Sequence, residues 1–138
     1  YYPENKMKYK NPPISKNIIC FESQVNWNEP IILCEGVFDA ITIKRNAIPL
    51  LGKFPSRNLV EKIFMSGVSD IIISLDSDAI NEALKAAEYF RKQGINVKMM
   101  YMEDKDASEI GYKKFYEQLK KTKEFSSEEL LLNKINSL

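Results

Sequence analysis

The stretch Val68-Ser69-Asp70-Ile71-Ile72-Ile73-Ser74-Leu75, followed by Asp76-Ser77-Asp78, decides the fold class of this chain. It contains a nearly continuous apolar run, which is typical of a parallel strand buried on both faces of a sheet. Similar runs occupy residues 31–34, 48–51 and 97–102, and each is followed by a loop or a helical segment. Strands that alternate with helices predict βαβ units, so we expect an α/β fold with a mostly parallel four-stranded sheet and helices on both faces.

Helical periodicity follows these strands. It predicts helices over residues 37–46, 56–65, 79–93 and 108–121, and a fifth helix from 127 to 135. The third helix shows the pattern most clearly, because Ala83 and Phe90 lie on one apolar stripe and Gly94 stands where a left-handed residue usually ends a helix. Before the first strand, the polar and proline-containing residues 1–29 indicate an irregular lead-in, with one short strand at 18–21.

The composition limits the possible chemistry. The chain has 138 residues, which favours one compact domain, and it contains no histidine. Ser-His-Asp and Cys-His catalysis, zinc sites with histidine ligands and a histidine general base are therefore excluded for this chain. Lys and Arg number 20 and Asp and Glu number 19, so the net charge is +1. Any affinity for nucleic acid must come from the placement of charges rather than from the total charge.

The cysteines and the apolar runs indicate a cellular compartment. Cys20 and Cys34 are too few and too far apart for a C-x-x-C metal or redox site, so we expect both to be reduced thiols. The apolar runs are far shorter than the about 20 residues that a membrane span needs, and no signal peptide is recognisable. We therefore expect a cytoplasmic protein with no membrane partner. The chain starts at Tyr1 rather than at methionine, which suggests a fragment of a longer protein.

Acidic residues follow three of the four predicted strands. Glu35 comes directly after the first strand, with Asp39 one helical turn further on. Asp76 and Asp78 follow the third strand, and Asp106 belongs to the acidic run after the fourth. In an open parallel sheet, ligands bind at the carboxyl ends of the strands, so we expect these carboxylates to share one crevice.

This concentration of negative charge has two interpretations. Asp76 or Asp78 taken alone could simply cap the following helix, because aspartate is a common N-cap residue. Several carboxylates at one sheet edge, however, repel one another unless cations occupy the site. Oxygen ligands without histidine or cysteine favour Mg²⁺ or Mn²⁺, and the chemistry that suits them best is metal-assisted phosphoryl transfer.

Three segments together carry a resemblance to a known family: Ile31-Ile32-Leu33-Cys34-Glu35-Gly36-Val37-Phe38-Asp39-Ala40, Leu75-Asp76-Ser77-Asp78 and Lys105-Asp106-Ala107-Ser108-Glu109. In this order they resemble the Toprim domain of primases and topoisomerases. The stretch Lys8-Tyr9-Lys10-Asn11-Pro12-Pro13 is similar to the segment that precedes Toprim in bacterial and phage DNA primases. The resemblance implies a remnant of a preceding primase subdomain over 1–29, a Toprim domain over 30–122 and a C-terminal helix over 123–138.

The resemblance also implies a function. A phage-like DNA primase would use nucleoside triphosphates to make short RNA primers on a single-stranded DNA template, with a replicative helicase as a further partner. Asp76, Asp78 and Asp106 would hold Mg²⁺ or Mn²⁺. Glu35 would also ligate the metal, or would handle the proton of the attacking 3′-hydroxyl. Asp39 would support the site from behind the metal ligands, and Lys105 would pair with a phosphate or with acidic neighbours.

Several alternatives stay open on the sequence alone. A Toprim nuclease would use the same metal site to activate water, and a non-catalytic Toprim module would bind nucleic acid or a partner protein. Lys105 could be an ordinary exposed loop lysine. Phe115, Tyr116 and Phe125 could stack on single-stranded nucleic acid, although the spacing of Phe115 and Leu119 favours the core face of an amphipathic helix.

Overall fold

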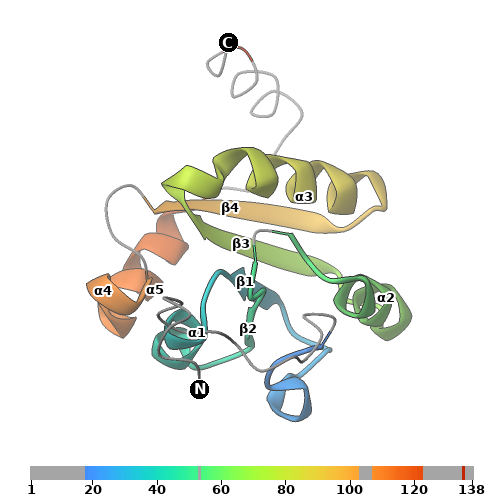
Figure 1. The fold of residues 1–138 in the computed structure, drawn as a ribbon, viewed down its shortest axis with the longest axis horizontal. Coiled ribbons are helices and arrows are strands. Elements are labelled where there is room, and N and C mark those ends of the chain that lie inside the picture. Colours follow the sequence, from blue (N-terminus) through green and yellow to red (C-terminus); the bar gives the residue numbers. More distant parts are fainter. Residues whose placement is uncertain (1–17, 53, 103–106, 123–134, 136–138) are drawn as a thin grey trace, which may run out of the picture.

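The sheet has four parallel strands in the order β2-β1-β3-β4. The computed structural model describes residues 18–52, 54–102, 107–122 and 135. Strand β1 spans Ile31–Cys34, β2 spans Ala47–Pro49, β3 spans Asp70–Asp76 and β4 spans Asn96–Met102. Strands β3 and β4 are the longest, and they pair side by side along their whole length (Figure 1). The expected α/β fold with a parallel four-stranded sheet is confirmed.

Helices connect the strands and cover the sheet. The α-helices are α1 (Val37–Ile43), α2 (Arg57–Ser66), α3 (Ile80–Lys92), α4 (Ala107–Ile110) and α5 (Tyr112–Lys121), and the short 3₁₀ helices are η2 (Glu22–Gln24) and η3 (Ser77–Ala79). Ser56 caps α2 by accepting a hydrogen bond from the N–H of Leu59, and Gly67 ends this helix in the left-handed conformation. In the described part of the chain, no helix combines the length and the apolar character that crossing a membrane requires.

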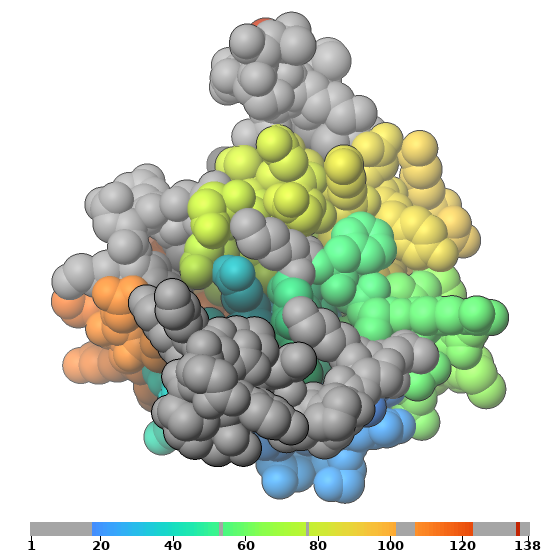
Figure 2. Space-filling view, viewed as in Figure 1, coloured from blue at the N-terminus to red at the C-terminus, as the bar shows by residue number. Residues whose placement is uncertain are grey.

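Alternation along the strands produces a core on each face of the sheet. Ile31 and Leu33 pack on the side of α2 and α3, whereas Ile32 and Cys34 pack on the side of α1, α4 and α5. All four residues of β1 are buried, which explains the unbroken apolar run of this strand. Figure 1 shows α1 and α3 on opposite sides of the sheet, and Figure 2 shows α2 and α3 as adjoining parts of the surface. Helices on both faces are therefore confirmed.

Phe115 of α5 belongs to the core on the α1 side. Its side chain is completely buried, and its ring packs edge-to-face against Tyr116 with centroids 5.4 Å apart. The hydroxyl of Tyr116 donates a hydrogen bond to the backbone oxygen of Ile43 at 2.9 Å, which ties α5 to α1. Leu119 packs against the same cluster. The core interpretation of Phe115 and Leu119 is confirmed, and a role of Phe115 as a stacking platform is wrong.

Two predicted elements are wrong. Residues 18–21 form no strand: Phe21 has a positive φ of 61°, which ends any extended run, and η2 begins directly after it. The predicted helix over 108–121 is two helices, because Gly111 has a φ of 86° and interrupts the helical hydrogen bonds between α4 and α5. The predicted helix from 127 to 135 lies outside the described residues, apart from residue 135.

Candidate metal centre

Three of the predicted acids converge at the carboxyl edge of the sheet. Glu35, Asp76 and Asp78 each offer one carboxylate oxygen, and these oxygens all lie within 4.8 Å of one another. Glu35 directly follows β1, Asp76 is the last residue of β3, and Asp78 lies in η3. Because β1 and β3 run parallel with Cys34 paired to Ser74, the ends of both strands reach the same edge. Strand register therefore brings together residues that are far apart in the sequence.

The local backbone does not use Asp76 as a helix cap. Asp76 occupies the N-cap position of η3 with an extended backbone, at φ −65° and ψ 158°, but its side chain makes no capping hydrogen bond. An aspartate in this position usually accepts a hydrogen bond from the first helical turn. Its carboxylate is instead grouped with those of Glu35 and Asp78. The capping interpretation therefore does not account for Asp76.

The environment of Glu35 favours its protonated form when no cation is present. Burial raises the pKa of Glu35 to about 7, and the neighbouring carboxylates of Asp76 and Asp78 add to the shift. The backbone N–H of Asp76 acts in the opposite direction, because it favours the ionised form. Two ionised carboxylates are both acceptors, so a hydrogen bond between Glu35 and Asp76 forms only when one of them carries a proton.

One oxygen of this site has no hydrogen-bond partner among the residues that the structure describes. Oε2 of Glu35 is buried, and within the described residues it accepts no hydrogen bond. A buried acceptor without a donor costs free energy, and a cation bound between the carboxylates would satisfy it. The three side chains offer only oxygen atoms, which suit hard divalent cations such as Mg²⁺ or Mn²⁺. The donor set and the unpaired oxygen therefore fit a divalent cation.

Asp39 lies beside this group but is not part of it. Its side chain is buried and makes hydrogen bonds with the backbone N–H groups of Gly36 and Ser108, at 3.2 Å and 3.0 Å. Asp39 lies in α1, and its carboxylate contacts the turn directly after Glu35 and the first turn of α4. Its role in supporting the site from behind the metal ligands stays a prediction. Lys105 and Asp106, the remaining predicted site residues, lie outside the described residues.

The contact between Asp39 and Ser108 is absent from the sequence prediction. In the sequence, Ser108 is the first residue of a predicted helix and part of the 105–109 segment, and neither feature predicts a contact with Asp39. The structure uses the backbone N–H of Ser108, which every residue except proline offers. No side-chain pattern could therefore have revealed this contact.

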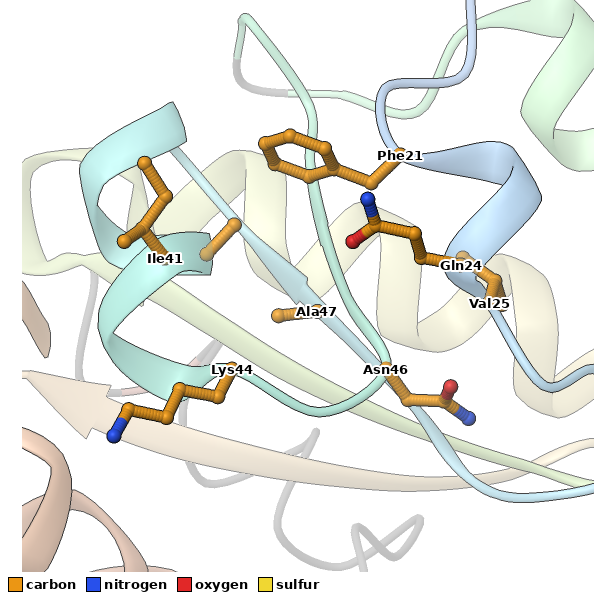
Figure 3. Close-up of a pocket in the computed structure, with 8 residues that line it drawn as sticks. Phe21, Gln24, Val25, Ile41, Lys44, Asn46 and Ala47 are labelled. Carbon is orange, nitrogen blue, oxygen red and sulfur yellow. The ribbon is translucent and has the colours of Figure 1, made fainter.

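A separate pocket lies near the other end of α1. It has a volume of about 290 Å³ and is lined by Phe21, Gln24, Val25, Ala40, Ile41, Lys44, Asn46 and Ala47. Figure 3 shows the ring of Phe21 extending toward Ile41 across this space. The side-chain amide of Asn46 is already used, because it donates to the backbone oxygens of Asn26 and Pro30. None of the described residues that line it carries a carboxylate, so the described structure does not join this pocket to the metal centre.

Comparisons with known proteins give a match only among solved structures. No known family profile matches the sequence, and no curated protein is similar to it. A DNA primase domain from Pseudomonas aeruginosa matches with a TM-score of 0.62 and 19% identity, covering 84% of this chain and 42% of that one. The E. coli primase catalytic core matches with a TM-score of 0.61 and 19% identity, covering 80% and 39%. The chain has the fold of part of a bacterial primase core.

A further structure, the DnaG primase catalytic domain bound to single-stranded DNA, matches with a TM-score of 0.62 and 18% identity, covering 80% of this chain and 38% of that one. The resemblance to the primase Toprim domain, which the sequence motifs indicated, is therefore confirmed at the level of the fold. The chain spans about two fifths of the length of the primase structures it matches.

Proposed function

We propose that this chain is the Toprim catalytic domain of a DNA primase, which synthesises short RNA primers on single-stranded DNA. The observation that carries the proposal is the convergence of Glu35, Asp76 and Asp78 at the carboxyl edge of the sheet. Ligand sites in open parallel sheets lie at this edge. The primase structures that share the fold support the same function, and one of them is bound to single-stranded DNA.

The reaction joins a ribonucleotide to the end of a growing primer. The 3′-hydroxyl oxygen forms a bond to the α-phosphorus of a nucleoside triphosphate, the bond to pyrophosphate breaks, and the hydroxyl proton leaves. A divalent cation held by this site, Mg²⁺ or Mn²⁺, would supply positive charge to offset the negative charge that develops on the phosphate oxygens. In this chain Asp76 and Asp78 would hold the cation, and Glu35 would either join them or accept the proton.

Two further residues have proposed roles that follow from the motif. Asp106 would add another carboxylate to the metal ligands, and Lys105 would pair with a phosphate of the nucleotide. A replicative helicase would be a partner of the primase. The proposal for Lys105 follows from charge complementarity, because an ammonium group stabilises a phosphate as a point charge.

The experiment measures two activities of the same preparation. A protein that contains this chain is incubated with single-stranded DNA, labelled ribonucleotides and Mg²⁺, and the products are examined for primer synthesis and for cleavage of the DNA. Incorporation without cleavage supports the primase. Cleavage without incorporation would favour a Toprim nuclease, in which the same carboxylates activate water for hydrolysis. Neither activity would favour a binding module.

A further inference from the structure

The pocket near the end of α1 has an exposed aromatic ring on its wall. Phe21 lies in the segment before β1, and its ring extends toward Ile41 of α1 across the hollow (Figure 3). Ile19, Val25 and Trp27 of the same segment are partly buried against the described core, whereas Phe21 is 36% exposed. An exposed apolar side chain on a concave wall offers contact area to a ligand.

The local backbone does not explain a phenylalanine at this position. Phe21 has a φ of 61° and a ψ of 22°, a left-handed conformation that glycine or asparagine adopts at lower cost. It occupies the N-cap position of η2, but its side chain makes no capping hydrogen bond. Strained positions of this kind are frequent where a side chain contacts a ligand. The ring and the pocket therefore have to be explained together.

The rest of the pocket suits a flat molecule with a polar edge. Its volume is about 290 Å³, and the small side chains of Ala40 and Ala47 also line it. Gln24 extends its side-chain amide toward this space (Figure 3), and among the described residues the amide has no hydrogen-bond partner. A side-chain amide both donates and accepts hydrogen bonds. An unstacked nucleobase needs both features, because its face stacks on aromatic rings and its edge forms hydrogen bonds.

Positive charge lies beside the pocket. Lys44 lines it, and the ammonium group of Lys44 lies over the ring of Tyr112, 4.7 Å from the centroid. Tyr112 begins α5, and the exposed Lys113 and Lys114 follow it. None of these three lysines forms an ion pair with a described residue, and no described residue of the lining carries a carboxylate. The surroundings of the pocket therefore favour an anionic ligand.

A tight turn holds Lys44 at this place. Lys44 has a φ of 72° and a ψ of −60°, and the N–H of Arg45 donates a hydrogen bond to the backbone oxygen of Ile43 at 2.9 Å, which closes a γ-turn. Such a conformation is rare for a residue with a side chain. Arg45 pairs with Glu29, so the charge of that acid is already offset. The turn therefore presents Lys44, and not the paired Arg45, to a ligand at the pocket.

We propose that this pocket binds one base of a single-stranded DNA and that the neighbouring lysines bind its phosphates. The base stacks on Phe21, and the amide of Gln24 forms a hydrogen bond to the edge of the base. Lys44 and the lysines that begin α5 offset the charge of the adjoining phosphates. The inference rests on the proposed function for the kind of strand, because a primase uses a single-stranded template. The pocket itself is separate from the metal centre, since Glu35 precedes the opposite end of α1.

Fluorescence anisotropy measures the binding of a labelled oligothymidine to the chain in EDTA, so that no divalent cation contributes. A second oligonucleotide of the same length has abasic sites in place of its bases, so it retains the phosphates and loses the stacking faces. The variants are Phe21→Ala, Phe21→Leu and Lys44→Ala. Phe54→Ala and Lys85→Ala are matched controls, because Phe54 is 46% exposed outside the pocket lining and Lys85 is exposed on α3, on the other side of the sheet (Figure 1). Circular dichroism verifies that each variant is folded.

We expect Phe21→Ala to weaken binding of the intact strand about 10-fold, which corresponds to the loss of one stacked base, and to leave binding of the abasic strand unchanged. Phe21→Leu should lose most of the same affinity, because leucine keeps an apolar contact but has no ring face. Lys44→Ala should weaken both strands and lower the slope of log affinity against log salt concentration by about 0.7, as for one lost phosphate contact. Phe21→Ala should leave this slope unchanged, and both controls should bind like the wild type.

Three results would overturn the proposal: no binding by the wild type, equal binding of intact and abasic strands by the wild type, or undiminished binding by Phe21→Ala. Polyglutamate that displaces the strand, and that itself binds Phe21→Ala more weakly than the wild type, would assign the pocket to an acidic protein segment instead. If strand binding fails while primer synthesis in Mg²⁺ persists, the proposed function stands and only the base site is wrong. Strand binding without primer synthesis would contradict the proposed function and leave the base site in place.

Discussion

Glu35 and Asp76 place carboxylate oxygens within 4.8 Å of each other, and the buried Oε2 of Glu35 accepts no hydrogen bond from the described residues. The two side chains come from the ends of adjacent parallel strands, β1 and β3. Each is an acceptor when ionised, so only a proton or a cation between them makes the contact favourable. The pair therefore links three measurable quantities: the stability of the metal-free protein, its pH dependence and its affinity for divalent cations.

Replacement of Asp76 by asparagine should separate stability from metal binding. Without a cation, Asp76→Asn removes one of the repelling charges and should raise the free energy of unfolding by about 1 kcal/mol. In millimolar Mg²⁺ the wild type should gain stability by mass action, and the variant should gain much less. Thermal unfolding with and without Mg²⁺ measures both effects. If the variant and the wild type respond equally to Mg²⁺, Asp76 is not a metal ligand.

The pKa of Glu35 predicts how stability depends on pH. Its ordinary value is 4.5, and in the folded chain it is about 7. Because its pKa is higher in the folded state, Glu35 binds its proton more tightly there than in the unfolded chain. This proton therefore adds to the free energy of unfolding. The contribution is complete below about pH 4.5 and is lost as the pH rises through 7. In a metal-free buffer, Glu35→Gln should remove this contribution from the stability curve. Urea unfolding at a series of pH values measures it.

Mg²⁺ should reverse the sign of this dependence, because a cation and the proton compete for Glu35. Above pH 7 the site is ionised and binds the cation most strongly, so stabilisation by Mg²⁺ should increase from pH 5 to pH 8. The same series repeated with millimolar Mg²⁺ tests this. A stabilisation by Mg²⁺ that is independent of pH would show that Glu35 does not contact the ion.

Asp78→Ala should abolish primer synthesis while the domain stays folded. Asp78 is exposed at the sheet edge and contributes nothing to the apolar core, whereas loss of a metal ligand removes stabilisation of the transition state. The measurement is incorporation of labelled ribonucleotide, with circular dichroism as the control for folding. Full activity in the variant would contradict the ligand role of Asp78.

Phe115→Ala should lower the free energy of unfolding by about 3–5 kcal/mol, because the side chain is fully buried and its removal leaves a cavity. Phe38→Ala is the matched control, since Phe38 is 77% exposed and the same substitution should change stability by less than about 0.5 kcal/mol. Urea unfolding of both variants provides the comparison. Equal effects would mean that α5 does not pack on the sheet as described.

The sequence by itself determined the fold class, because each strand is an apolar run followed by a helical period. The run at Ile71-Ile72-Ile73 has this form because β3 is buried on both faces. The sequence also placed Glu35 and Asp76 at strand ends, since the polar residues that follow an apolar run mark where the strand stops. It missed the break between α4 and α5, because a glycine such as Gly111 fits either a continuous helix or a residue with positive φ, and the structure has a φ of 86° there.

Only the tertiary structure decided which acids meet. Asp39 and Glu35 are close in the sequence, yet Asp39 is directed to Ser108 and Glu35 is grouped with Asp76 and Asp78. Strand order and register determine this grouping, and they depend on contacts between segments that are distant in the chain. The partner of Asp39 is a backbone N–H, which carries no side-chain signature. The N–H of Ser108 reaches Asp39 only because the sheet places α4 beside α1. This dependence on tertiary packing is the physical reason that the sequence alone could not predict the contact.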